Sequence, residues 1–239
     1  MVTIRNVDKM YADKQVLFSF STKIETDKKK IYGLIGPNGA GKTTFLKVLT
    51  GILDYSSGDI TVDGNADYKE WCRNNIILIP SGERGLRFKN TVHDNVMYYS
   101  AMKGLQEQRC RGLLNEYAEI MNFSDFLDRR VETLSMGQKK KAMLLCGLCT
   151  DMKVILMDEP SNGLDIDAQL ELQKTINILS KGYDKTFLIS SHDLGFVSEV
   201  VNSYVFIFEG KNVTEFEGKT SMEQIRSLYS SLRDHEDTL

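Results

Sequence analysis

The pattern of hydrophobic and polar positions predicts strands toward both ends of the chain and helices in its middle. Residues 1 to about 30 alternate between apolar and polar side chains, as in VTIRNV and QVLFSFSTKI, which indicates two strands joined by a polar turn at residues 12–14. Short apolar runs follow in KIYGLIG from Lys30 and in NIILIP, with the strand-like SGDITVDG between them. After the first of these runs, KTTFLKVLTGIL has the apolar spacing of a helix that reaches Ile52.

The chain turns helical from Thr91 to about Leu148. TVHDNVMYYSAMKG begins with a good capping residue and stops at Gly104, and EQRCRGLLNEYAEIMNF and DFLDRRVETL follow as further helical segments. Strands return in KVILMDEP, KTFLISSHD and SYVFIFEGKNVTEF, with the amphipathic helix DAQLELQKTINILSK between the first two. The tail, SMEQIRSLYSSLRDHEDTL, predicts a terminal helix with a frayed acidic end. Strands alternating with helices favour an α/β fold whose parallel sheet is interrupted by an all-helical insertion at about residues 85–148.

Composition narrows the possible partners. The 239 residues, 41% hydrophobic and 26% charged, suit one large globular domain or two small ones, with a sizeable core. A net charge of -3 disfavours a nucleic-acid partner, because no global positive field would attract one. The longest apolar runs are too short to span a bilayer, and the first residues lack the apolar core of a signal peptide. We therefore expect a soluble, cytosolic protein.

Two of the four cysteines, Cys146 and Cys149, form a C-x-x-C that could bind zinc or act in redox chemistry. They lie in AMLLCGLCTD, an apolar helical stretch with no second C-x-x-C and no nearby histidine. We expect buried core thiols.

The segment GPNGAGKT, residues 36–43, fits the pattern G-x-x-x-x-G-K-[ST] between a predicted strand and a predicted helix. Its glycines let successive backbone N–H groups turn toward phosphate oxygens, with Lys42 reaching the β- and γ-phosphates and the Thr43 hydroxyl ligating Mg²⁺. No N-K-x-D guanine motif occurs, which disfavours a GTPase. The residues expected at the nucleotide are Gly36, Pro37, Asn38, Gly39, Ala40, Gly41, Lys42, Thr43 and Thr44.

A pair of carboxylates ends the apolar run VILMDEP. Asp158 is suited to hold the magnesium shell, and Glu159 is suited to polarise the water that attacks the γ-phosphate. The apolar run LISSHD similarly ends near His192. An acidic cluster that only caps a helix, and a structural histidine, are the alternatives.

Five motifs together resemble the ATP-binding-cassette (ABC) family, and in the family's order. GPNGAGKTT looks like Walker A, LSMGQ from Leu134 like the signature, and VILMDE like Walker B with the catalytic glutamate. SNGLD, residues 161–165, looks like the D-loop, and His192 like the switch histidine. The resemblance covers nearly the whole chain. It implies a P-loop NTPase with a RecA-like parallel core, an N-terminal antiparallel β subdomain and an α-helical signature subdomain, divided as residues 1–80, 81–148, 149–218 and a C-terminal 219–239.

The resemblance also implies roles for individual residues. Glu159, His192 and Lys42 would be catalytic, with His192 at the γ-phosphate of ATP. Tyr11 matches the aromatic that stacks on adenine, with an ordinary strand aromatic as the alternative. The nucleotide site further includes the D-loop Asp165. From a second cassette in a head-to-tail homodimer or heterodimer come the signature residues Ser135, Gly137 and Gln138.

One departure from the family lies after NIILIP, where a glutamine that senses Mg²⁺ and contacts the membrane subunit is usual. Here the sequence reads SGERGLRF, so Ser81 or Glu83 would have to serve. ERGL is similar to cassettes of drug, peptide, lipid or polysaccharide exporters. We expect a separate permease docking on about residues 81–102 and holding the chain at the cytoplasmic face of the membrane. Soluble cassettes acting on ribosomes, DNA or Fe–S assembly, and cassettes that bind ATP without hydrolysing it, are the competing classes.

Three lysines follow the signature, in LSMGQKKKAM. They spread around a helix, so all three cannot point at one ligand. They form either a solvated helix face or a face from which one lysine assists the nucleotide.

Overall fold

The computed structural model describes residues 1–26, 30–64, 67–83 and 85–236, which fold around two sheets. The smaller, antiparallel sheet has the order β2-β1-β4, with β1 (Val2–Tyr11), β2 (Lys14–Ile24) and β4 (Ser57–Val62). The larger has the order β5-β6-β7-β3-β8-β9, with β3 (Ile31–Ile35), β5 (Ile76–Ile79), β6 (Val154–Asp158), β7 (Thr186–Ser191), β8 (Ser203–Phe208) and β9 (Lys211–Glu217). All its pairings are parallel except that of β8 with β9.

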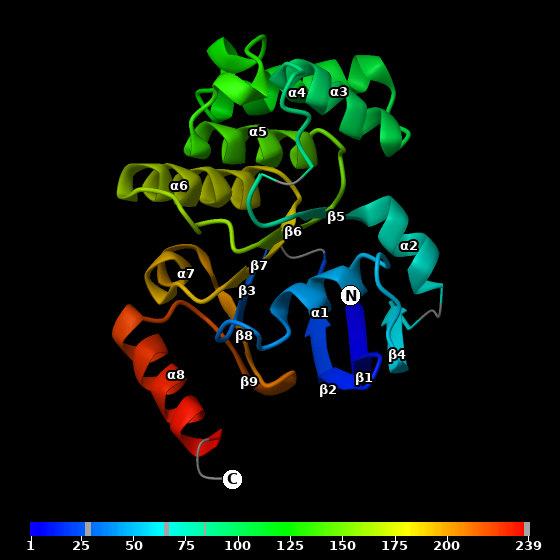
Figure 1. Cartoon of the computed structure of the whole chain (residues 1–239), viewed down its shortest axis with the longest axis vertical. Helices are drawn as coiled ribbons and strands as arrows, with labels where there is room; N and C mark the ends of the chain where they lie inside the picture. The colour runs from blue at the N-terminus through cyan, green and yellow to red at the C-terminus, as the bar shows by residue number, and fades with distance from the viewer. Residues whose placement is uncertain (27–29, 65–66, 84, 237–239) are drawn as a thin grey trace.

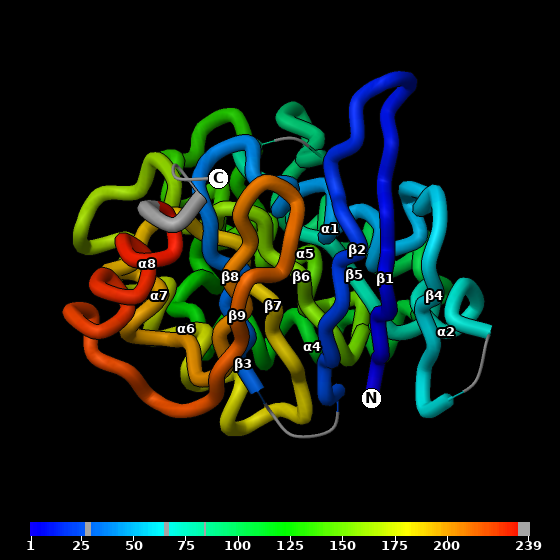
Figure 2. The backbone as a smooth tube through the Cα atoms, turned by 90° about the horizontal axis from the view of Figure 1, so that it is seen from below, coloured from blue at the N-terminus to red at the C-terminus, as the bar shows by residue number. Residues whose placement is uncertain are grey.

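Eight helices surround these sheets in the described part of the chain (Figure 1). They are α1 (Lys42–Leu49), α2 (Tyr68–Asn75), α3 (Val92–Met102), α4 (Glu107–Ile120), α5 (Met136–Leu148), α6 (Ile166–Gly182), α7 (Leu194–Val200) and α8 (Met222–Glu236). Figure 1 shows α3, α4 and α5 gathered at one end of the molecule, away from the antiparallel sheet. Figure 2 shows the β1–β2 hairpin beside the larger sheet.

The central strands are buried on both faces, which explains their unbroken apolar runs. Along β3, Ile31 and Ile35 enter a core shared with the helical end of the molecule. The alternate residues Tyr32 and Leu34 enter a second core shared with α1 and the antiparallel sheet. The fold class expected from the sequence is therefore confirmed.

Two helical expectations are wrong. Helix α1 ends at Leu49, before a left-handed Gly51 (φ 68°), so Ile52 lies outside the helix and is 71% exposed. DFLDRRVETL forms only two 3₁₀ turns, Ser124–Phe126 and Val131–Thr133. Its carbonyl groups instead accept hydrogen bonds from the start of α3, where the N–H groups of residues 92 and 93 bind the oxygens of residues 129 and 127.

Helices α2 and α7 were not expected from the sequence. Each is short, eight and seven residues, and offers little periodicity to recognise. The C-terminal helix is confirmed as α8, with Ile225 fully buried against the core. The last part of its expected acidic end, residues 237–239, lies outside the described residues.

The thiols of the C-x-x-C are free and fully buried. Burial raises the pKa of both Cys146 and Cys149 well above the ordinary thiol value. Within the described residues, no group of three or more His, Cys, Asp and Glu side chains could hold a metal ion. The expectation of core thiols is confirmed.

Candidate active site

Three neighbouring strands bring the candidate catalytic residues to one edge of the parallel sheet. Strand β3 ends at Ile35, directly before the phosphate loop, while β6 ends at Asp158 and β7 at Ser191. In the ladder Ile35 lies opposite Ser191, and Asp158 lies opposite Ser190. Because the carboxyl ends of adjacent parallel strands meet at the same edge, segments far apart in sequence converge here.

The phosphate loop depends on two glycines. A Cβ atom at Gly36 would lie 2.0 Å from the carbonyl oxygen of Ile207 on β8, so no larger residue fits there without moving the backbone. Gly41 adopts φ 101°, a left-handed conformation, and is the N-cap of α1. The loop therefore ends with Lys42 and Thr43 in the first turn of a helix, where backbone N–H groups and the helix dipole favour an anion.

Lys42 is the buried positive centre of the site, with 6% of its side chain exposed. Its Nζ donates hydrogen bonds to the carbonyl oxygens of Gly36, at 2.7 Å, and Pro37, at 3.0 Å. It also lies 3.0 Å from Oε1 of Glu159. A cation this desolvated is stable only with close partners, and all of these are oxygen atoms of the site itself.

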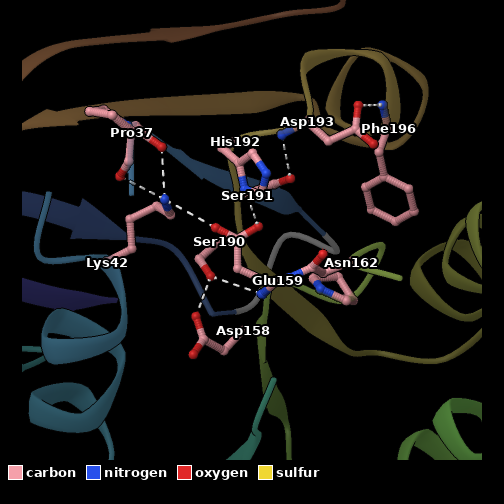
Figure 3. Close-up of polar contacts among 12 residues, drawn as sticks. Pro37, Lys42, Asp158, Glu159, Asn162, Ser190, Ser191, His192, Asp193 and Phe196 are labelled. Atoms are coloured by element: carbon pink, nitrogen blue, oxygen red, sulfur yellow. Dashed lines mark hydrogen bonds and ion pairs between the residues drawn. The ribbon is translucent and has the colours of Figure 1, made fainter. Parts of the chain in front are cut away.

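Glu159 lies between Lys42 and His192 (Figure 3). Its Oε2 is 2.8 Å from Nδ1 of His192, while its Oε1 faces Lys42. The residue adopts φ 47°, which costs a non-glycine residue about 1–3 kcal/mol. Its backbone N–H donates to both the carbonyl oxygen and the hydroxyl of Ser190, each at 3.1 Å, and this holds the strained turn in place.

Ser190 is a positioning residue that the sequence analysis did not single out. Its hydroxyl donates to Oδ1 of Asp158 at 2.6 Å, while the Thr43 hydroxyl donates to Oδ2 at 2.8 Å. Both carboxylate oxygens of the buried Asp158 are thereby fixed. The signal was the pair of hydroxyls that ends the otherwise apolar strand LISS, beside the strand carrying the carboxylates.

The side chains of Thr43 and Asp158 fit a magnesium ion. Mg²⁺ prefers oxygen ligands and is usually held by one or two carboxylates together with substrate phosphates and water, without a cage of protein ligands. A hydroxyl and a carboxylate only 2.8 Å apart, next to the phosphate loop, are such a donor set.

Tyr11 lies at the end of β1, and its hydroxyl is 3.5 Å from Oγ1 of Thr44 in the first turn of α1. The side chain is 44% exposed, and Nζ of Lys9 lies 5.2 Å from the ring centre. Asp165 lies at the start of α6. Its Oδ1 accepts a hydrogen bond from the N–H of Ala168 at 2.8 Å, so the side chain caps this helix and has a structural role in this chain.

The signature residues lie at the start of α5, in a groove of about 350 Å³ that none of the phosphate-loop residues lines. The Ser135 hydroxyl accepts from the N–H of Gln138 at 3.3 Å, and the N–H of Ser135 donates to Oε1 of Gln138 at 2.9 Å. This capping box ties the two side chains together. Gly137 packs against α6, where an added Cβ would lie 3.3 Å from Cβ of Ala168.

The three lysines after the signature do not form a solvated face, and that prediction is wrong. Lys139 and Lys141 have 16% of their side chains exposed, and Lys140 is also partly buried. Each has partners within the chain: Lys139 pairs with Glu83, and Lys141 pairs with Glu171. Burial lowers the pKa of Lys140, while the nearby carboxylate of Glu159 opposes that shift.

The segment that lacks the family's glutamine leads from β5 to α3. Oε1 of Glu83 lies 3.1 Å from Nζ of Lys139, so this carboxylate is paired with α5. Ser81 is exposed at the end of β5.

Comparison with known proteins agrees with this geometry. The family model described as ABC transporter matches residues 20–162. The chain is 34% identical over 229 residues to the lantibiotic transport ATP-binding protein SrtF of Streptococcus pyogenes, covering 94% of this chain and 95% of that protein. It is 33% identical to the petrobactin import ATP-binding protein YclP of Bacillus subtilis, covering 90% of this chain and 86% of that protein. It is also 33% identical to the Nod factor export ATP-binding protein I of Burkholderia orbicola, covering 90% and 70%.

Among solved structures, the chain superposes on cbiO1 of Clostridium perfringens, part of the ABC transporter complex cbiONQ, with a TM-score of 0.82 and 23% sequence identity. The match covers 98% of this chain and 93% of that one, so the two share a fold. The family model spans more than half of the chain, and the relatives above 30% identity align with at least nine-tenths of it. The chain therefore belongs to the ABC transporter family and is an ATPase of its ATP-binding-cassette type.

Proposed function

We propose that this ATPase hydrolyses Mg²⁺-ATP at the edge of the sheet where Lys42, Glu159 and His192 meet, and thereby drives a separate membrane permease. The observation that carries the proposal is the contact of one carboxylate, that of the largely but not fully buried Glu159, with both a cation and an imidazole, at 3.0 Å and 2.8 Å. In this reading Lys42 binds the β- and γ-phosphates, with phosphate oxygens replacing Glu159 as its partners. Thr43 and Asp158 hold Mg²⁺, which supplies charge neutralisation on the phosphate oxygens.

Glu159 is the general base of the proposed reaction. Once Lys42 is engaged by phosphate, the Glu159 carboxylate is available to accept a proton from the attacking water. His192 holds the other carboxylate oxygen and so fixes its direction. With 43% of its side chain exposed, His192 is open to the side from which the γ-phosphate would arrive.

The hydrolysing unit in this proposal is a head-to-tail dimer of cassettes. In this dimer Ser135 and Gly137 would serve an ATP that a second chain binds, and their place in a groove without phosphate-loop residues supports the proposal. A helix N-terminus suits the γ-phosphate of that ATP. Gln138, whose Oε1 accepts the hydrogen bond from the N–H of Ser135, would hold Ser135 in place. The chain retains both halves of such a site, which suits a homodimer and equally a heterodimer.

The membrane partner is proposed on family membership and on the surface of the helical end. No helix in the described residues has the length and apolar character required to cross a bilayer. The expected docking segment contains three exposed large apolar residues, Phe88, Tyr98 and Met102. We place the chain at the cytoplasmic face of the membrane through this contact.

Export is the direction we favour. The segment SGERGLRF is similar to that of export cassettes, and the names of SrtF and the Nod factor protein fit a peptide or an oligosaccharide cargo. Import is the second candidate, because YclP is named for petrobactin import at nearly the same identity. Transport into or out of vesicles that contain the co-expressed permease distinguishes the two.

The substitution Glu159→Gln tests the catalytic assignment. Gln is nearly isosteric and loses the base, so we expect ATP turnover to fall about 100-fold or more, about 2.7 kcal/mol in the barrier. ATP binding and ATP-dependent dimerisation should persist. Lys42→Ala should instead weaken ATP binding itself, which separates binding from chemistry. Turnover by the Glu159→Gln protein within threefold of the unchanged chain would refute the role of this residue.

A further inference from the structure

Lys140 contacts the turn that directly follows the catalytic carboxylate. Its Nζ donates a hydrogen bond to the carbonyl oxygen of Pro160 at 2.8 Å and a second, short one to the carbonyl oxygen of Asn162. Hydrogen bonds from a charged donor are about twice as strong as neutral ones. The ammonium group on α5 therefore holds two backbone carbonyls of the segment that joins Glu159 to α6.

This turn has a conformation that needs support from outside. Glu159 and Gly163 both have positive φ, at 47° and 75°. Within the turn the N–H of Asn162 donates to the carbonyl oxygen of Glu159 at 3.2 Å. On one side the backbone of Glu159 is fixed by Ser190, and on the other side Lys140 binds the carbonyls that follow. Glu159 is thus held from both sides of its own backbone.

The two neighbouring lysines have different partners, although they lie on the same helix. Lys139 pairs with Glu83 before α3, and Lys141 pairs with Glu171 on α6 and donates to the carbonyl oxygen of Met121. Neither contacts the turn after Glu159 in the described structure. Lys140 also lines a small cavity together with Glu159 and Pro160.

We infer that Lys140 is a positioning residue for ATP hydrolysis, which fixes the turn at residues 160–162 and through it the direction of the Glu159 carboxylate. The inference rests on the proposed role of Glu159 as the base. Through this contact the start of α5 and the backbone of Glu159 would move together. In the proposed dimer the signature at the start of α5 faces an ATP bound by the partner, while Glu159 faces the ATP of its own chain.

The kinetic test compares four variants of the full-length chain at saturating Mg²⁺. Lys140→Met removes both hydrogen bonds and should lower kcat about tenfold. KM for ATP should change less than about twofold, because the ammonium group, although its side chain lines the signature groove, is bound to the carbonyls of Pro160 and Asn162 and not directed at a ligand. Lys140→Arg keeps the charged donor and should restore kcat to within about threefold. Lys140→Gln keeps one donor and should fall between them. The matched control, Lys139→Met, removes an equal charge from the same helix at a residue that pairs with Glu83 and lines neither the signature groove nor the cavity beside Glu159, and it should leave kcat within about twofold.

Hydrogen exchange gives a readout that does not depend on the chemistry. The amides of residues 161–164 should exchange faster in Lys140→Met than in the unchanged chain, and at an unchanged rate in Lys139→Met. If Lys140→Met does not fold, as judged by its thermal unfolding midpoint, the kinetic and hydrogen-exchange comparisons are made with Lys140→Gln instead. The inference is overturned if kcat falls equally in Lys140→Met and Lys139→Met, if the loss is in KM, or if exchange in the turn is unchanged. If Glu159→Gln retains turnover while exchange in Lys140→Met is faster, Glu159 is not the general base, although Lys140 does stabilise the turn at residues 160–162.

Discussion

The placement of Tyr11 predicts a measurable loss of adenine binding when its ring is removed. The ring is partly exposed, and its hydroxyl lies 3.5 Å from Thr44, at the start of the helix that carries Lys42 and Thr43. Stacking of a base on an aromatic ring is worth about 1–3 kcal/mol when measured by alanine substitution. Tyr11→Ala should therefore raise the Kd for ATP by about 5- to 150-fold. Tyr11→Phe removes only a hydroxyl contact at the limit of hydrogen bonding and should bind within about twofold of the unchanged chain.

Equilibrium binding of ATP and of inorganic triphosphate, each with Mg²⁺, measures the two halves of the ligand separately. If Tyr11 acts on the base, Tyr11→Ala should bind triphosphate as well as the unchanged chain does. An equal loss for both ligands would mean that the substitution disturbs α1 and the phosphate loop. An affinity for ATP within twofold of the unchanged value would show that the ring is an ordinary strand aromatic.

Two further predictions concern stability and thiol chemistry. Hydrogen bonds from the Ser57 hydroxyl, at 2.6 Å, and the Ser19 N–H hold the pKa of Asp8 below its ordinary value of 3.8. The stabilisation is therefore present above about pH 4 and is lost as the pH falls through the folded-state pKa of Asp8. In urea unfolding, Asp8→Asn should have a lower free energy of unfolding than the unchanged chain at pH 7, and this difference should shrink at acid pH. A difference that stays constant with pH would refute the linkage. Burial raises the pKa of Cys146 and Cys149, so both thiols should resist a disulfide reagent in the folded chain and react at once in denaturant. Fast reaction of these thiols in the folded chain would contradict their burial.

The catalytic edge of the sheet could be predicted because its parts are local. A glycine-rich loop between a strand and a helix, and carboxylates at the end of an apolar strand, have meaning within a few residues of sequence. Parallel pairing then brings the ends together, as the opposition of Asp158 and Ser190 illustrates. Ser190 itself was missed, because a serine at a strand end has many structural uses and the two hydrogen bonds of its hydroxyl depend on which strand lies alongside.

The segment DFLDRRVETL was misjudged for a related reason. Its apolar spacing is compatible with a helix, yet its carbonyls bind the backbone at the start of α3, including an isolated bridge between Thr91 and Arg130. Tertiary hydrogen bonds can override local propensity wherever a better set of partners is available. No periodicity in this segment reports the presence of α3, which comes about 30 residues earlier in the chain.

The lysines after the signature show where the limit of sequence reasoning lies. Their spread around a helix correctly excludes a common ligand, but it cannot say whether the surroundings are water or protein. In the structure each lysine binds a different segment: the stretch before α3, the turn after Glu159, and α6. A helix start that carried only a solvated face could shift without consequence for Glu159. Because Lys140 binds the carbonyls of Pro160 and Asn162, any displacement of the signature by a partner's ATP must also act on the turn beside the proposed base.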